Sequence, residues 1–213
     1  MSEVLIVGEA GCCALLGDAV FNKHILLDSR TKNCYGLHMT EIVERDNPVL
    51  RKHAKPVPVH EITSEPIKKI IAKMAKAMHA QKDGVAIAAP QIGESLQIFV
   101  ISGPLLRKAD KTYKGDTSDL IFINPKITKY SKERNTVEEG CLSVRWLYGK
   151  VERSKKVTLK AHNEKGEICE RGASGLLAQI FQHECDHLNG IIFTDKADEL
   201  WEMTEEEIAE IQS

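Results

Sequence analysis

The clearest alternation of apolar and polar positions lies between residues 63 and 84 and predicts an α-helix. Apolar side chains recur every three or four residues, which is the spacing of one buried helix face: Ile67, Ile70, Ile71, Met74 and Met78. Ser64 or Thr63 can cap the start of this helix, and Gly84 lies just beyond its end. Methionines at this spacing are typical of a hydrophobic core rather than of a cofactor site, so we expect the helix to pack inward.

A second helix is predicted from about Gly175 to the pair Asn189-Gly190, which is typical of a helix C-terminus. Its first half is rich in apolar side chains: Leu176, Leu177, Ile180 and Phe181. Its second half carries several ionisable residues in the stretch "QHECDHL". Because the apolar half buries much of this helix, the ionisable residues need hydrogen-bonding partners or a metal ion.

The remaining apolar runs predict strands and turns. We expect strands at residues 96–102, 120–125 and 126–130, the last two separated by an Asn-Pro turn, and a hairpin over residues 155–174. Residues 103–119 are polar and contain glycine, which favours a loop, and residues 198–212 predict a third, acidic helix. Helices and strands are interspersed without a strict βαβ rhythm, which favours the α+β class.

Composition and charge narrow the class of protein. A chain of 213 residues with a formal net charge of -2 carries no long Lys/Arg block, so we expect no direct nucleic-acid binding. The basic stretch "RSKKVTLK" alternates and predicts one solvated face of a strand. No apolar run approaches the roughly 20 residues of a membrane span, and six cysteines without a CxxC pair favour a reducing cytoplasm. We therefore expect a cytoplasmic protein that does not bind membranes.

Residues 1–38 show neither a helical period nor a strand alternation. The organised pattern begins at Met39, which is a candidate second translation start. We therefore predict three parts: an N-terminal extension of unknown role at 1–38, a catalytic domain at 39–198 and the acidic C-terminal helix at 199–213.

The stretch "QHECDHLNG" carries the first candidate chemistry. His183 and His187 are four residues apart and lie on one helix face, where they can hold one metal ion with Glu184 beside it as an acid or base. The alternative is a helix whose polar residues simply face solvent. The apolar residues upstream weaken that alternative.

Two histidines leave a metal site incomplete. Downstream of His187 there is no histidine, and the candidate ligands are carboxylates: Asp195, Asp198, Glu199 and Glu202. Upstream, Cys141 follows a glycine in "EEGCLSV", and a thiolate is a strong ligand for a borderline metal. The other cysteines are interpreted as inert: Cys12, Cys13, Cys34, Cys169 and, packed on its helix, Cys185.

A third stretch, "GVAIAAPQIG" at 84–93, combines small residues with the amide donor of Gln91. Small residues let the backbone approach a ligand closely. Taken alone, the stretch is also typical of a tight turn between a helix and a strand.

Together, "GVAIAAPQ", "EGCLS" and "QHECDHLNG" resemble, in order, the three motifs of the peptide deformylase family. The resemblance extends from about Met39 to Asp198 and implies an α+β fold with antiparallel strands packed around a central helix that bears the His-Glu-x-x-His motif. It implies metal binding by Cys141, His183 and His187, with water in the fourth position. It further implies Glu184 as the catalytic acid/base, oxyanion contacts from Gln91 and the Leu142 N–H, and a bracing pair of Glu139 with Arg153.

The resemblance implies an enzyme that removes the formyl group from N-formylmethionyl nascent polypeptides and releases formate. It implies one divalent metal, with Fe²⁺ expected in the cell and Zn²⁺, Ni²⁺ or Co²⁺ as other ions that suit the same ligands. Two alternatives remain: a zincin-type endopeptidase, which would take a downstream carboxylate ligand, and a catalytically silent deformylase-like peptide-binding protein.

Several positions depart from the family pattern. The substrate-binding set implied by the resemblance is Ala86, Ile87, Gln179 and Ile180. Ala86 replaces a usual glycine, and Gln179 replaces an apolar residue of the methionine pocket, so the side-chain preference of the substrate is open. Arg145 stands where a proline or small residue is common. The acidic residues 199–213 have the wrong sign for RNA phosphate, so we expect ribosome proximity without docking by this segment.

Overall fold

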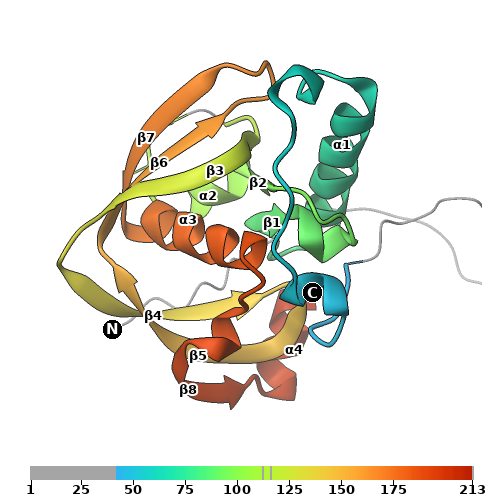
Figure 1. The fold of residues 1–213 in the computed structure, drawn as a ribbon. Helices are drawn as coiled ribbons and strands as arrows, with labels where there is room; N and C mark the ends of the chain where they lie inside the picture. Colours follow the sequence, from blue (N-terminus) through green and yellow to red (C-terminus); the bar gives the residue numbers. More distant parts are fainter. Residues whose placement is uncertain (1–41, 112, 116, 213) are drawn as a thin grey trace, which may run out of the picture.

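A computed structural model of the chain describes residues 42–111, 113–115 and 117–212 (Figure 1). The predicted N-terminal extension and Cys12, Cys13 and Cys34 lie outside these residues. The described α-helices are α1 Glu65–His79, α2 Gly103–Ala109, α3 Gly175–Leu188 and α4 Glu205–Gln212. The strands are β1 Ala86–Ala88, β2 Ile98–Ile101, β3 Leu120–Tyr130, β4 Arg134–Cys141, β5 Val144–Ser154, β6 Lys156–His162, β7 Ile168–Ser174 and β8 Ala197–Glu202. Short 3-10 helices are η1 Pro48–Arg51, η2 Val59–Glu61, η3 Ala89–Ile92 and η4 Phe193–Asp195.

The strands form two antiparallel sheets, one of five strands in the order β1-β2-β3-β6-β7 and one of three in the order β4-β5-β8. Helix α3 lies between them and packs against both β6 of the larger sheet and β5 of the smaller one (Figure 1). Antiparallel sheets around a central helix confirm the α+β prediction. In the part of the chain that the structure describes, no helix has the length and apolar content needed to cross a bilayer.

Helix α1 buries the predicted face. Ile67, Ile71, Met74 and Met78 are buried and form one cluster with apolar residues of β1 to β3. Ser64 occupies the N-cap position, as expected, but its side chain makes no capping hydrogen bond. Burial of these four apolar side chains, rather than a hydrogen bond from the Ser64 side chain, therefore fixes the helix against the larger sheet.

Helix α3 also matches its predicted span, ending at Leu188 with Asn189 as the C-cap residue. Phe181 on this helix contacts Phe122 of β3, with ring centroids 5.1 Å apart in an edge-on arrangement. Phe122 also contacts Phe99 of β2, at 4.9 Å. These aromatic contacts hold one side of α3 on the larger sheet. The opposite side of the helix faces the smaller sheet.

The predicted Asn-Pro turn between 120–125 and 126–130 is wrong, because β3 runs through both segments. Asn124 has a left-handed backbone (φ +52°), and the register with β6 shifts between Ile123 and Lys126. The Asn124 side chain accepts a hydrogen bond from the Val57 N–H (2.8 Å) and donates one to the Val57 carbonyl (2.7 Å). This amide stabilises a β-bulge, so the strand bends and continues instead of turning.

The predicted loop at 103–119 begins with a short helix, α2. Ser102 caps it by accepting a hydrogen bond from the Leu105 N–H at 3.3 Å, and a proline stands in its first turn. Seven residues are too few for a recognisable helical period, which is why the pattern of apolar positions missed it.

The acidic C-terminal helix is shorter than predicted. Residues 197–202 form β8 and pair with β5, and α4 begins only at Glu205. Thr204 and Glu207 form a capping box, because the Glu207 carboxylate accepts from the Thr204 N–H and the Thr204 hydroxyl accepts from the Glu207 N–H. The helix start was therefore encoded in "TEEE", whereas the strand before it depended on pairing with a distant segment.

Candidate active site at a Cys/His/His cluster

Two elements, β4 and α3, bring the three candidate metal ligands together. Cys141 is the last residue of β4, and His183 and His187 lie one turn apart on α3. Their ligand atoms all lie within 4.8 Å of one another, and the Cys141 Sγ is 3.2 Å from the His187 Nε2. Two atoms that share one zinc-sized ion at bond lengths of about 2.0–2.3 Å lie roughly 3–4 Å apart, so the donor set fits a single metal ion.

The downstream carboxylates lie elsewhere. Asp195 pairs with Arg51 at 2.5 Å and accepts a hydrogen bond from the Ile192 N–H, and Glu199 pairs with Lys150 at 2.7 Å. Asp198 and Glu202 are exposed on β8. In the residues that the structure describes, the cluster of potential metal ligands contains none of the four.

The position of Cys141 depends on a tight turn between β4 and β5, in which Cys141 pairs with Val144. Gly140 comes immediately before it. A Cβ on Gly140 would lie 2.7 Å from the Tyr148 ring, closer than real Cβ contacts allow. Glycine is therefore required here for β4 to approach β5 and present the sulfur to α3.

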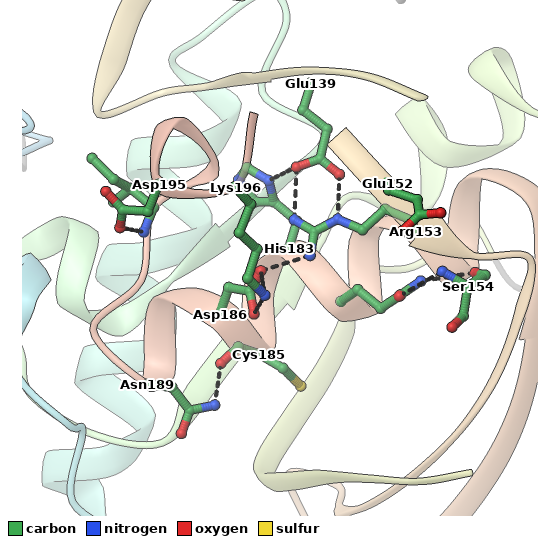
Figure 2. Close-up of polar contacts among 12 residues, drawn as sticks. Glu139, Glu152, Arg153, Ser154, His183, Cys185, Asp186, Asn189, Asp195 and Lys196 are labelled. Atoms are coloured by element: carbon green, nitrogen blue, oxygen red, sulfur yellow. Dashed lines mark hydrogen bonds and ion pairs between the residues drawn. The ribbon is translucent and has the colours of Figure 1, made fainter. Parts of the chain in front are cut away.

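Glu139 fixes the orientation of His183. Its Oε2 is 2.9 Å from the His183 Nδ1, which leaves the Nε2 of this ring for a metal ion. Both carboxylate oxygens of Glu139 also accept hydrogen bonds from Arg153 at 2.8 Å, as Figure 2 shows. Burial alone would raise the pKa of Glu139, but Arg153 and His183 lower it to about 2. The predicted Glu139–Arg153 pair is thus present, and it orients His183, a candidate metal ligand.

The network extends to two residues that the sequence analysis missed. Arg153 donates to the Asp186 Oδ2 at 2.6 Å, and Lys196 contacts both oxygens of Asp186 at 2.7 Å (Figure 2). Asp186 stands inside the His-Glu-x-x-His motif at a position that the metal pattern leaves free. The sequence signal that could have identified Asp186 was its position directly before the candidate ligand His187.

The electrostatics of the cluster favour metal binding. Burial alone would raise the pKa of the Cys141 thiol, but His187 and His183 lower it to about 5. Burial alone would likewise lower the pKa of His183, yet Cys141 and Glu139 raise it well above its ordinary value. Without a metal, the thiolate and the imidazolium stabilise each other. A cation would displace that proton and keep the thiolate.

Glu184 is a second buried carboxylate of the site, with 3% of its surface exposed. Burial raises its pKa to about 7, although His183 and His187 act in the opposite direction. Its Oε2 is buried without a hydrogen-bonding partner. An acid/base near neutrality with a free oxygen is suited to move a proton between water and a substrate.

Gln91 of η3 points its amide group at the cluster. Its Oε1 accepts a hydrogen bond from the Ala88 N–H at 2.8 Å, which fixes the amide orientation. Its Nε2 lies 3.4 Å from the Cys141 Sγ and 3.3 Å from the Ser143 Oγ, with 1% of the residue exposed. The stretch with the small residues is therefore more than a turn, since it carries a donor to the metal-ligand group.

A pocket of about 120 Å³ opens beside the cluster. A cavity of about 150 Å³ holds a benzene-sized group, so this one suits a single side chain. Ala86, Leu142, Gln179 and Ile180 line it together with Cys141, His183 and Glu184. Ile87 does not: its side chain is fully buried in the cluster beneath α1, because alternate residues of a strand face opposite sides.

The other described cysteines lie apart from the ligand group. Burial raises the pKa of Cys185 to about 12, and it packs against the core as predicted. Cys169 on β7 is half-buried, and burial also raises its pKa. Neither thiol has the lowered pKa that favours metal binding.

A Cys/His/His cluster, an adjacent buried carboxylate and a pocket between two sheets are together typical of a hydrolase with one metal ion. The polypeptide deformylase family model matches residues 39–202. A peptide deformylase of Carboxydothermus hydrogenoformans is 43% identical over 162 residues, which cover 75% of this chain and 94% of the relative. The chain therefore belongs to the peptide deformylase family and is an enzyme of that type.

Solved structures agree with this assignment. The crystal structure of the peptide deformylase of Thermotoga maritima matches with a TM-score of 0.65 and 38% identity, over 76% of this chain and 99% of that one. The Met-Ala-Ser-bound class I type b peptide deformylase of Acinetobacter baumannii matches with a TM-score of 0.65 and 34% identity, over 73% and 96%.

Proposed function

We propose that this enzyme removes the N-terminal formyl group from N-formylmethionyl peptides and releases formate. The observation that carries the proposal is the approach of the Cys141 sulfur to the His187 Nε2, 3.2 Å away, beside a buried Glu184. The Met-Ala-Ser peptide bound to the Acinetobacter baumannii relative supports a substrate that begins with methionine.

The proposed metal ligands are Cys141, His183 and His187, and ferrous iron is the ion we expect in the cell. Zinc, nickel and cobalt suit the same sulfur and nitrogen donors. When bound, such an ion would lower the pKa of a water molecule and polarise the formyl carbonyl. Glu139, held by Arg153, keeps the His183 ring in the orientation that this binding needs.

Glu184 would move the proton. As a carboxylate, it accepts a proton from the attacking water, and as a carboxylic acid it then protonates the departing amine. Burial raises the pKa of Glu184 above the ordinary carboxyl range, which makes the carboxyl group a better proton acceptor. Burial excludes bulk water, which would otherwise exchange this proton.

Gln91 and the Leu142 N–H would hold the formyl oxygen as it gains negative charge. The Gln91 amide is fixed through Ala88 and stands 3.4 Å from the Cys141 sulfur. Donors that are fixed before the reaction stabilise a developing oxyanion more effectively than mobile water.

The side chain of the formylated residue would enter the pocket beside Ala86, Gln179 and Ile180. The Gln179 amide donates one hydrogen bond to the Glu138 carbonyl at 2.8 Å, which satisfies part of its polar group within the protein. We therefore expect methionine to be accepted despite the polar residue, with tolerance for other unbranched side chains.

The alternatives have less support. An endopeptidase of the zincin type would use a downstream carboxylate, and Asp195 and Glu199 are paired with Arg51 and Lys150. A silent peptide-binding protein would have no use for a buried Glu184. We expect cytoplasmic action on nascent peptides, without docking of the acidic α4 on RNA phosphate.

Formate release from formyl-Met-Ala-Ser by anaerobically prepared, Fe²⁺-loaded protein tests the proposal. Glu184→Ala should retain the metal and lose roughly 10²–10⁴-fold in kcat, because it removes the acid/base. The fold of the variant is checked by its circular dichroism. Equal rates in the two proteins, or no formate from either, would refute the proposal.

A further inference from the structure

The start of β5 departs from regular pairing next to the metal-ligand group. Cys141 pairs with Val144 and Gly140 pairs with Tyr148, so residues 145–147 have no partners on β4. These three residues form a bulge directly opposite Cys141, and all of them line the pocket. Bulges beside active sites redirect side chains, so the bulge is a candidate for substrate contact.

Trp146, at the centre of this bulge, has a left-handed backbone with φ +65°. Such a conformation is unfavourable for a bulky side chain and persists only where the surroundings impose it. Among the described residues, the other non-glycine with positive φ is Asn124, whose two hydrogen bonds to Val57 account for it. For Trp146, the carbonyl accepts a hydrogen bond from the Met203 N–H at 2.8 Å, which anchors the backbone, and the residue lines the pocket.

Arg145 ties the bulge to the opposite wall of the pocket. Its guanidinium donates to the Asp83 carboxylate at 2.7 Å and to the Gln81 side-chain oxygen at 2.6 Å, both in the loop between α1 and β1. The same guanidinium lies 5.3 Å from the centre of the Trp146 ring. Arg145 thus fixes the indole by a cation–π contact, and the Asp83 carboxylate neutralises the charge of the guanidinium.

A peptide in the site has an edge strand available. β1 is the terminal strand of its sheet, and Val85 and Ala86 line the pocket. An extended peptide beside such an edge places successive side chains on alternating sides. Both this edge and the bulge line the pocket, and the Arg145–Asp83 ion pair joins the bulge to the loop before β1. A peptide whose formyl end lies at Cys141 would therefore have these two segments beside its following residues.

From this arrangement we infer that Trp146 is a specificity-determining residue. Its indole receives a large apolar or aromatic side chain from one of the two residues that follow the formylated one. The neighbouring wall is apolar, with Leu142, Val144 and Leu147, and the Arg145 charge is already paired, so an acidic side chain gains little there. This inference rests on the proposed deformylase function and names a second determinant of its substrate.

Three peptides test the inference: formyl-Met-Ala-Ser, formyl-Met-Phe-Ser and formyl-Met-Ala-Phe. With the metal-loaded wild type, we expect kcat/KM for at least one Phe peptide to exceed that for the Ala-Ser peptide by about three- to tenfold, the range of an aromatic contact. Trp146→Gly removes the ring and suits a positive φ, so the local backbone conformation is retained, and circular dichroism checks that the variant folds. Its Phe preference should drop to about one, whereas Trp146→Phe should retain most of it.

Asn124→Gly is the matched control, because it makes the same backbone change at the other left-handed residue, away from the pocket. Its Phe preference should equal that of the wild type. If formate is released but the wild type shows no Phe preference, or if Trp146→Gly keeps it, the inference about Trp146 is wrong and the proposed function stands. If none of the three peptides releases formate, both are wrong.

Discussion

At the scale of single residues, the Glu139 carboxylate has two roles in the site: it pairs with Arg153 and it orients His183. Glu139 accepts from Arg153 with both oxygens and from the His183 Nδ1 with one of them. A buried carboxylate that lacked Arg153 would be costly, and a His183 that lacked Glu139 would be free to rotate or to change tautomer. The geometry of the candidate ligands is therefore set by residues outside the Cys141, His183 and His187 group.

Glu139→Gln should weaken metal binding by roughly 10- to 100-fold, because the neutral amide replaces an acceptor oxygen by a donor that faces other donors. The measurement is a competition between protein and a chelator for Zn²⁺ at fixed pH. Glu152→Gln, the same change at an exposed ion pair with Arg134, is the control and should leave the affinity unchanged. The same Kd in both variants would contradict a role for Glu139 in orienting His183.

At the scale of elements, the paired strands β4 and β5 position the sulfur, and α3 positions the imidazoles. The hairpin can approach the helix in this way because Gly140 leaves room for the Tyr148 ring. The Tyr148 ring in turn stacks on Trp201 of β8, with centroids 6.3 Å apart. A larger residue at Gly140 would therefore disturb the packing of the smaller sheet as well as the position of Cys141.

Gly140→Ala should destabilise the protein by about 1–3 kcal/mol, because the added methyl overlaps the Tyr148 ring and moves β4 away from β5. Urea unfolding of the metal-free protein measures this change without a contribution from the ion. Gly172→Ala on β7 is the control, since no atom lies within 4 Å of its added methyl. Equal midpoints for the two variants would show that the space at Gly140 is not required.

At the scale of the whole molecule, the candidate metal site connects the two sheets. Cys141 belongs to the smaller sheet, and the histidines belong to a helix whose aromatic residue packs on the larger one. An ion bound by this cluster would therefore act as a cross-link between the two sheets. Ligand binding to the folded state alone stabilises it in proportion to the logarithm of ligand concentration.

Removal of the metal should lower the Tm, and refilling the site should restore it. At a free-ion concentration of 100 times Kd the stabilisation is about 2.7 kcal/mol, or roughly 5–10 °C for a chain of this size. Scanning calorimetry before and after chelation measures the shift. Cys141→Ser, which loses the thiolate, should respond much less to added ion. A wild-type Tm that is independent of metal would argue against a cross-linking ion.

Much of this architecture could be predicted from the sequence, for identifiable reasons. The face of α1 and the span of α3 follow from local periodicity, and Cys141, His183, Glu184 and His187 follow from the chemistry of their side chains and from three motifs in order. The bulge at Trp146, the bend at Asn124 and the strand β8 were missed. They depend on pairing with distant segments, which periodicity along the chain does not record. Ile87 was expected beside Ala86 in the substrate-binding set, but alternation along β1 turns its side chain to the opposite face.

The separation in sequence between Cys141 and His183 has a consequence for biosynthesis. The sulfur leaves the ribosome well before the imidazoles, and its position near them exists only after the β4–β5 hairpin has closed onto α3. Until then Cys141 is an ordinary thiol, open to oxidation and without its lowered pKa. A metal ion held by these three residues would therefore be loaded late, after the segments that carry Cys141 and His183 have met.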